Sequence, residues 1–305
     1  MDKILYMVVP CYNEEAVLEE TTARLKEKFE SLIKEDKISP KSKVLYVNDG
    51  SKDKMFRGIC LSRNRGHQNA VLCGLMQAKE EADMVISMDA DLQDDINAID
   101  EMVDKYHEGF DVVYGVRNSR KTDTFFKRFT AQAYYKMLLF MGVDIVYNHA
   151  DFRLMSKRVL KEMENYKEVN LFLRGIVPMI GFPSTNVYYE RHERFAGESK
   201  YPLKKMLHFA FDGITSLSVK PIRLITTVGA GIFFLSICML IYSIVIHFLG
   251  KSLVGWSSLM VSVWALGGLQ IFSIGVIGEY IGKIYMETKA RPRFIVQEYL
   301  NDDEE

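Results

Sequence analysis

The chain has 305 residues, enough for one large domain or two smaller ones, and 48% of them are hydrophobic and 26% charged, as in soluble globular proteins. The net charge of −1 gives no reason to expect nucleic acid as a partner. The four cysteines lack the spacing of a metal site and are expected to be buried, reduced thiols. The first residues lead directly into a strand-like run, so no signal peptide is expected.

Short apolar runs alternate with segments of helical spacing over the first 115 residues. The apolar runs predict strands at 4–9, 43–47, 56–61, 83–88 and 111–115. The helical spacing predicts helices at 14–34, 68–79 and 96–107. Strands that alternate with helices predict an α/β domain with a doubly wound, mostly parallel sheet.

One connection in this pattern is too short for a parallel crossover. Residues Gly50 to Met55 alone separate the predicted second and third strands, whereas such a crossover normally needs a dozen residues or more. Either the connection is unusual, or the natural chain has a segment here that this sequence lacks. We favour the second explanation, which an intact mass matching this sequence would refute.

Two long runs without Asp, Glu, Lys or Arg follow, Leu224 to Leu249 and Val254 to Gly278. About 20 apolar residues suffice to span a bilayer as a helix, so each run predicts a transmembrane helix; two buried core helices are the alternative. Lys and Arg flank the outer ends of both runs, and the short loop between them holds only Lys251. Because positive flanks stay inside, both termini are expected in the cytoplasm.

Two segments, 125–143 and 202–218, mix basic with apolar residues and predict amphipathic helices lying on the membrane; ordinary surface helices are the alternative. The predicted organisation is therefore a cytoplasmic domain over 1–220, a two-helix transmembrane domain over 221–285 (helices near 224–249 and 254–280) and a cytoplasmic tail over 286–305.

Polar residues follow three of the predicted strands. Asn13 and Glu14 follow the first, Asp49 the second, and Asp89 and Asp91 the fourth. Each cluster alone could be a turn or a helix cap. Since the carboxyl ends of parallel strands meet at one edge of a sheet, together they predict a ligand site. Carboxylates suit ribose hydroxyls and Mg²⁺ or Mn²⁺, so the predicted ligand is a nucleotide with a metal-bound diphosphate.

With these motifs the chain resembles inverting family 2 glycosyltransferases of the polyprenyl-phosphate type. It is similar to dolichol-phosphate mannose synthases and bacterial undecaprenyl-phosphate glucosyltransferases. The resemblance covers nearly the whole chain, including both predicted spans. The motifs that carry it lie at residues 10–15, 48–51, 61–70, 88–94, 114–117, 150–155, 194–201 and 277–285. The chain departs from the family after Ser51, where members usually have a helix, and this puts the local geometry at Asp49 in doubt.

The resemblance implies a GT-A-like nucleotide-diphospho-sugar transferase fold and three groups of site residues. The nucleotide and donor sugar would be bound by Pro10, Tyr12, Asn13, Glu14, Asp49, Ser51, Asp89, Ala90 and Asp91. The metal would be held by Asp91, Gln93 and Asp89. The acceptor phosphate would be bound by Arg117, Arg153, Ser199 and Lys200, and the catalytic residues would be Asp151, Asp89 and Arg117.

The chemistry of the implied acceptor agrees with this division. A lipid phosphate monoester is largely dianionic near neutral pH, so it is already a nucleophile and hardly needs a general base. The site must instead neutralise charge and align the reactants, which suits Arg and Lys on the phosphate and a metal on the leaving diphosphate. Asp151 would then stabilise positive charge on the sugar or orient its hydroxyls. A structural ion pair with Arg153 is the alternative.

Other motifs have ordinary interpretations beside functional ones. His67 follows Gly66 at a predicted helix start, and a capping or surface histidine is the interpretation that we favour. Glu279 lies four residues before Lys283, which predicts an interfacial ion pair. The polar loop around Gly197 suits either a flexible basic loop or a lid.

The resulting hypothesis is an enzyme of the bacterial plasma membrane, with its active site and both termini cytoplasmic. It would transfer a hexose from a UDP-sugar, UDP-glucose first and UDP-N-acetylglucosamine second, to undecaprenyl phosphate with inversion, for cell-envelope glycosylation. A homo-oligomer, a downstream flippase and an extracellular transferase are expected as partners. The alternatives are a processive polysaccharide synthase, which two spans argue against, and a non-catalytic membrane scaffold, which the intact acidic motifs argue against.

Overall fold

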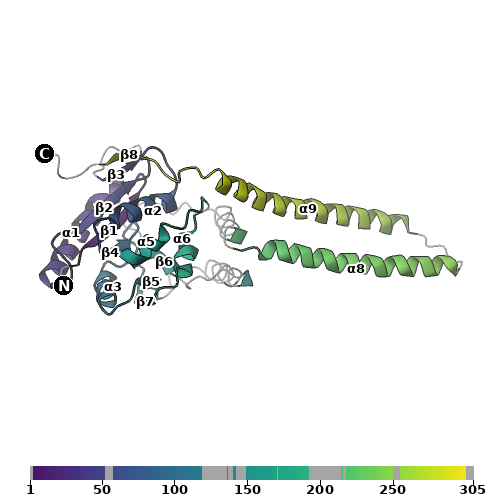
Figure 1. Ribbon diagram of the computed structural model, residues 1–305, viewed down its shortest axis with the longest axis horizontal. Helices are drawn as coiled ribbons and strands as arrows, with labels where there is room; N and C mark the ends of the chain where they lie inside the picture. Colours follow the sequence, from purple (N-terminus) through teal and green to yellow (C-terminus); the bar gives the residue numbers. More distant parts are fainter. Residues whose placement is uncertain are drawn as a thin grey trace.

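The computed structural model describes residues 3–51, 58–118, 136, 140–141, 149–169, 171–191, 214–215, 218–249 and 255–299. Apart from two long helices near the C-terminal end of the chain, the described residues form a domain with an eight-stranded sheet at its centre (Figure 1). Its strands are β1 (Leu5–Cys11), β2 (Lys43–Asn48), β3 (Ile59–Leu61), β4 (Met84–Ser87), β5 (Val112–Arg117), β6 (His149–Ser156), β7 (Ser184–Tyr189) and β8 (Val296–Tyr299), in the order β7-β5-β6-β4-β1-β2-β3-β8.

The strand directions confirm the predicted doubly wound, mostly parallel sheet and add antiparallel strands to it. β1 is parallel to β2 and β4, β2 is parallel to β3, and β5 is parallel to β7. β6 runs antiparallel between β4 and β5, and β8 runs antiparallel at the edge beside β3. The sequence predicted β1 to β5 but missed β6, β7 and β8.

Helices cover both faces of the sheet, which makes three layers. Residues of α1 (Glu15–Lys34) and α3 (Ala98–His107) share one buried core, and residues of α2 (His67–Ala78), α5 (Lys157–Met163) and α6 (Leu173–Met179) share the other. In β1, Met7 and Val9 belong to the first core and Tyr6 and Val8 to the second, as the two-residue period of a strand dictates. Burial on both faces explains why the strands read as continuous apolar runs.

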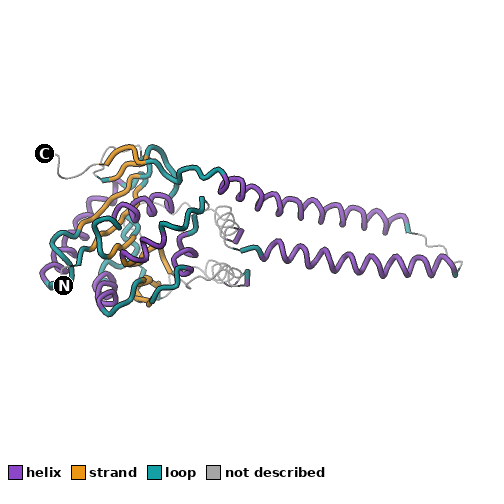
Figure 2. Tube along the Cα trace, viewed as in Figure 1, coloured by secondary structure: helices purple, strands orange, loops and turns teal. Residues whose placement is uncertain are grey.

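Two long helices, α8 (Lys220–Phe248) and α9 (Trp256–Thr288), project together from the sheet domain (Figures 1 and 2). Both contain segments long and apolar enough to cross a membrane by length and composition. These segments are 0% and 6% buried, and Phe234 and Ile271 are largely exposed. Core helices of a soluble domain would be buried, so the exposure argues against the alternative of two core helices.

The chain returns to the sheet after α9. β8 pairs with β3, and the Ser62 N–H donates to the Ile295 carbonyl (3.0 Å). The Arg293 guanidinium donates to the Tyr166 carbonyl (2.9 Å), and Glu287 in the last turn of α9 accepts the Val169 N–H (2.7 Å). The segment predicted as a plain tail therefore ties the end of α9 to the sheet domain.

Some predictions fall outside the described residues. Of the amphipathic segments 125–143 and 202–218, the structure describes only residues 136, 140–141, 214–215 and 218. The short connection between β2 and β3 includes residues 52–57, which are also not described. The missing-segment explanation for that connection stays a prediction.

Candidate active site

The ends of β1 and β2 bring together several of the residues predicted to bind the nucleotide. The strand register pairs Cys11 with Asn48, so the residues that follow are neighbours. The Asn13 N–H donates to Ser51 Oγ (3.0 Å), and the Ser51 N–H donates to Asn48 Oδ1 (2.7 Å). Tyr12 is 46% exposed beside them, so its ring is accessible to a flat ligand such as a base.

Other residues predicted to bind the nucleotide make contacts that stabilise the fold. Pro10 lies in β1 beyond the last residue that pairs with β4, so its missing N–H costs no bond to β4. The Glu14 carbonyl accepts the N–H groups of Val17 and Leu18 at the start of α1. Asp49 is only 3% exposed. Its two oxygens accept the backbone N–H groups of residues 65 (2.7 Å) and 66 (2.9 Å), so Asp49 fixes the approach to α2 instead of lying open to the ribose.

The loop after β4 carries the predicted metal ligands. The Ala90 carbonyl accepts the Thr21 hydroxyl (2.8 Å) from the buried side of α1, and Asp91 Oδ1 accepts the Gln93 N–H (3.2 Å). Leu92 adopts a positive φ of 56° with its side chain buried in the core. Such a conformation costs a non-glycine residue about 1–3 kcal/mol, so the core holds this loop in a strained shape.

The donor set of this loop fits a divalent cation in part. Asp89 and Asp91 offer the hard oxygen atoms that Mg²⁺ and Mn²⁺ prefer. The Oε1 atom of Gln93 instead accepts a hydrogen bond from Arg191, so Gln93 does not face an ion in this arrangement. Within the described ranges, no three His, Cys, Asp or Glu side chains converge closely enough to hold an ion.

Negative charge accumulates around Asp89. Although 39% of its side chain is exposed, burial raises its pKa to about 6. The carboxylates of Asp94, Asp151 and Asp91 act in the same direction, and His67 acts in the opposite one. A cation bound here would relieve that repulsion, so Asp89 and Asp91 are the residues that fit the predicted metal.

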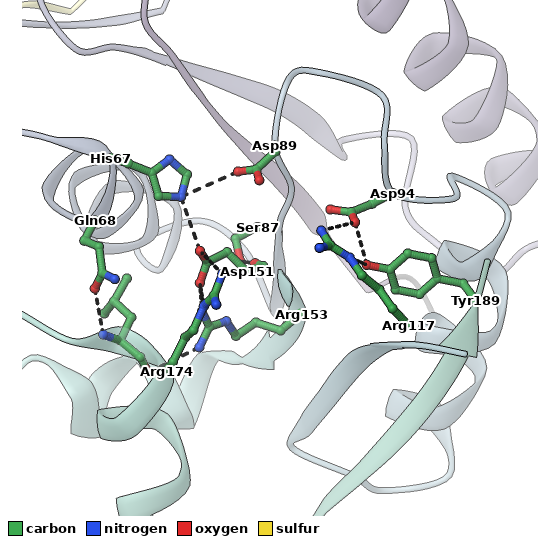
Figure 3. A network of polar contacts seen from close by, with 11 residues as sticks. His67, Gln68, Ser87, Asp89, Asp94, Arg117, Asp151, Arg153, Arg174 and Tyr189 are labelled. Carbon is green, nitrogen blue, oxygen red and sulfur yellow. Dashed lines mark hydrogen bonds and ion pairs between the residues drawn. The ribbon is translucent and has the colours of Figure 1, made fainter. Parts of the chain in front are cut away.

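Asp151 lies at the centre of a cluster of cations at the start of β6 (Figure 3). Arg174 from α6 donates from Nε to Oδ1 (3.1 Å) and from its terminal nitrogen to Oδ2 (3.0 Å), which is a bidentate pair. Arg153 donates to Oδ1 (2.6 Å). Burial alone would raise the pKa of Asp151, but Arg174, His67 and Arg153 outweigh it and hold that pKa well below its ordinary value. Asp151 is therefore an ionised anchor and not a proton acceptor near neutral pH.

The structure contradicts the prediction that Arg153 contacts the acceptor phosphate. Its side chain is 1% exposed, and it donates to Asp151 and to the Leu173 carbonyl (3.2 Å). A phosphate could reach it only if this core rearranged. Arg174, for which the sequence indicated no role, is the more accessible of the two arginines, with 27% of its side chain exposed.

His67 joins the two acidic parts of the site. Its Nε2 atom lies 3.5 Å from Asp89 Oδ1 and 3.5 Å from Asp151 Oδ2 (Figure 3). Burial lowers the pKa of His67, but the two carboxylates outweigh burial and raise it to about 9. His67 is therefore a surface histidine, as predicted, but its imidazole lies within ion-pair distance of two carboxylates.

A second polar cluster holds Arg117, which was predicted to bind phosphate and to act in catalysis. Its guanidinium donates to Asp94 Oδ1 (3.0 Å) and to the Tyr189 hydroxyl (3.3 Å), and Tyr189 donates to the same Asp94 atom (2.5 Å; Figure 3). Burial opposes protonation of Arg117, but Asp94 and Tyr189 outweigh burial and raise its pKa above the ordinary value. Asp94, which ends the motif at residues 88–94, is buried in this cluster and anchors Arg117 beside the loop that follows β4. With 26% of its side chain exposed, Arg117 remains reachable by a phosphate.

Ser199 and Lys200, the other predicted acceptor-phosphate residues, lie outside the described part of the chain. The sequence did not indicate a role in the site for His67, Arg174, Tyr189 or Arg191. The first two occur in the sequence as Gly66-His67-Gln68 and Leu173-Arg174-Gly175. A polar residue beside a glycine at the start of a helix was the sequence feature that could have marked them as site residues. That feature does not reveal which residue of a distant strand the side chain contacts.

Comparison with known proteins places the sequence in a family. Residues 6–164 match Glycosyl transferase family 2, and residues 220–284 match the GtrB C-terminal hairpin. The uncharacterized glycosyltransferase YkoT of Bacillus subtilis (strain 168) is 55% identical over 306 residues, covering 96% of this chain and 91% of the relative. The bactoprenol glucosyl transferase of Shigella phage SfX is 37% identical over 308 residues, covering 95% and 98%. The prophage bactoprenol glucosyl transferase homolog of Escherichia coli (strain K12) is 36% identical, covering 95% and 97%.

Solved structures with related folds are more distant. Mannosyl-3-phosphoglycerate synthase from Rubrobacter xylanophilus is 13% identical, with a TM-score of 0.47, over 73% of this chain and 74% of that one. The family match and the full-length relatives decide the assignment, and they agree with a mixed sheet whose strand ends carry the acidic motifs. This chain belongs to glycosyltransferase family 2, and it is a glycosyltransferase with a GT-A-like fold.

Proposed function

We propose that this enzyme transfers glucose from UDP-glucose to undecaprenyl phosphate at the cytoplasmic face of the bacterial plasma membrane, with inversion. The observation that carries the proposal is the similarity over nearly the full length, hairpin included, to relatives named bactoprenol glucosyl transferases. Bactoprenol is undecaprenol, so the named acceptor and the apolar hairpin agree. UDP-N-acetylglucosamine is the alternative donor.

The positions of several site residues support this proposal. Tyr12, Asn13 and Ser51 at the ends of β1 and β2 are accessible to a nucleotide. Asp89 and Asp91 would hold Mg²⁺ or Mn²⁺, which when bound would neutralise the leaving nucleoside diphosphate. The cationic side chains Arg174 and Arg117 would meet the phosphates, since both are partly exposed and each is held by a buried carboxylate.

The chain's own residues favour a mechanism without a general base. Three cationic side chains, His67, Arg153 and Arg174, pair with the Asp151 carboxylate and stabilise its ionised form. A phosphate monoester dianion can attack the anomeric carbon without losing a proton. We therefore assign Asp151 the task of fixing cations around the reacting groups, which lowers the barrier by alignment and electrostatics.

The proposal is tested by incubating the purified protein with undecaprenyl phosphate, Mg²⁺ or Mn²⁺, and a panel of UDP-sugars, and then measuring the mass of the lipid product. The expected product is undecaprenyl-phosphate glucose, formed only with UDP-glucose. An N-acetylhexosamine adduct would identify UDP-N-acetylglucosamine as the donor instead of UDP-glucose. A sugar polymer without a lipid adduct would favour a processive synthase.

Orientation needs a separate test. Ser252→Cys, in the short loop between the two spans, should react with an impermeant maleimide added outside intact cells, whereas a cysteine at exposed Glu30 on α1 should react only after lysis. Cys238 lies within α8 and is replaced by serine in both variants of the pair. The opposite labelling pattern would place the sheet domain outside the cell.

A further inference from the structure

The first turn of α2 lies where the ends of three strands converge. Gly66, with a φ of 87°, precedes His67 and lets the chain turn into the helix. Asp49, at the end of β2, accepts the N–H groups of Arg65 and Gly66 on its two oxygens. The backbone that carries His67 is therefore fixed from the β2 side.

The next residue fixes the same turn from the other side. The Oε1 atom of Gln68 accepts the Leu173 N–H (2.9 Å) at the start of α6, the helix that supplies Arg174. Because the Gly66 backbone is bonded to Asp49 and the Gln68 side chain is bonded to α6, the backbone at His67 has little freedom to turn the imidazole elsewhere. Its side chain points toward Asp89 and Asp151 (Figure 3).

The contacts of the imidazole differ from those of a helix cap. A capping side chain belongs to the N-cap residue and accepts backbone N–H groups of the first turn, and the N-cap residue of α2 is Gly66, which has no side chain. The Nε2 atom of His67 instead lies equally far, 3.5 Å, from a carboxylate of the β4 loop and from a carboxylate of β6. With 42% of its side chain exposed, the imidazole lies between these groups at a surface that a substrate can reach.

We propose that His67 is a positioning residue for glycosyl transfer, whose Nε2 atom, within ion-pair distance of both the Asp89 and the Asp151 carboxylates, holds them in fixed relative positions. Asp89 belongs to the donor side of the site and Asp151 holds the cations that meet phosphate. Their separation therefore decides whether the two reactants are aligned. Misplacement by about 1 Å can cost about 100-fold in rate, so the arrangement matters most to turnover. This inference rests on the proposed lipid-phosphate acceptor.

The test compares His67→Ala with His67→Gln, whose side-chain amide keeps an N–H donor near the position of Nε2. For His67→Ala we expect kcat to fall about 100-fold, since alignment is lost, while KM for the UDP-sugar changes less than about threefold. His67→Gln should recover at least about tenfold of that loss, as a positional role requires. The exposed His107 in α3, which contacts the Lys37 carbonyl, supplies the matched control His107→Ala with unchanged kcat.

Two outcomes would overturn the inference. A kcat of His67→Ala within about twofold of the wild type would show that the bridge does not align the site, and equal losses in the Ala and Gln variants would show that the N–H is not what matters. Thermal unfolding of each variant separates both outcomes from a folding defect. If the wild type itself does not glycosylate undecaprenyl phosphate, the proposed acceptor is wrong, and the same ratios are then measured on hydrolysis of the UDP-sugar.

Discussion

Removing the charge of Asp151 should destabilise the protein more than removing either arginine that it holds. In Asp151→Asn, the fully buried Arg153 keeps its charge but loses its counter-ion, and Arg174 loses a bidentate partner. Breaking a buried ion pair in this way costs about 3–5 kcal/mol. For a domain of this size each kcal/mol lowers the melting temperature by about 2–4 °C, so we expect a decrease of roughly 6–20 °C.

The reverse change is predicted to be milder. In Arg153→Met, Asp151 still pairs with Arg174 and His67, and the remaining loss is the hydrogen bond to the Leu173 carbonyl, about 1–3 kcal/mol. The double variant Asp151→Leu with Arg153→Met should regain much of the stability that Asp151→Asn loses, since an apolar pair can replace a buried ionic one. It should stay inactive, because Arg174 and His67 have then lost their anchor.

Thermal and urea unfolding of the full chain in detergent micelles measures these differences, with lipid glycosylation and UDP binding measured on the same samples. Asp151→Asn should still bind UDP but lose transfer. A change in unfolding free energy below about 1 kcal/mol for Asp151→Asn, or a larger one for Arg153→Met, would refute the reasoning from burial and shared partners.

Four further predictions follow from single observations. Asp91→Ala should abolish metal-dependent turnover while the protein stays folded, as shown by transfer assays and circular dichroism; surviving turnover would remove Asp91 from the metal ligands. Gly50→Ala should cost more unfolding free energy than Gly181→Ala. Both have a positive φ, but an added Cβ at Gly50 would lie 2.6 Å from a backbone nitrogen, whereas nothing lies within 4 Å at Gly181. Because the folded-state pKa of Asp151 is depressed, its stabilisation is present above the ordinary value near 3.9 and is lost as pH falls through the folded value. Melting curves of the wild type and Asp151→Asn should therefore converge on acidification, and parallel curves would contradict the depressed pKa. Glu287→Gln should lower the melting temperature modestly and leave UDP binding intact, since it weakens one contact between α9 and the sheet domain.

Much of the fold could be predicted because its early strands carry their signal locally. Runs such as 4–9 and 83–88 are apolar throughout since both of their faces are buried. β6 was missed because it carries two charged residues, Asp151 and Arg153, which pair with each other and with groups of α6 and α2 in the folded chain. β8 was missed for the opposite reason: it is short and exposed, and its place in the sheet depends on pairing with β3.

Some residues of the candidate site could be predicted from the sequence and others could not. Asp89 and Asp91 could be found because they follow a buried strand, and parallel strand ends converge whatever the rest of the fold does. The roles of Arg153 and His67 could not be assigned, because they depend on burial and on which distant carboxylate each side chain meets. A motif that pairs Asp and Arg two residues apart is compatible with either a ligand site or a buried anchor, and only the packing of α6 decides between them.

The arrangement of charge around Asp151 bears on what kind of acceptor the enzyme can use. A hydroxyl acceptor would need a base to remove its proton, and Arg174, His67 and Arg153 hold the pKa of the candidate carboxylate, Asp151, well below its ordinary value. A base that is so strongly stabilised as an anion has little tendency to take a proton. A phosphate dianion needs no such base but does need fixed positive charge, which this cluster provides. The cluster around Asp151 is therefore better suited to a phosphate acceptor than to an alcohol, and a simple alkyl alcohol should be a far poorer acceptor than an alkyl phosphate of the same length.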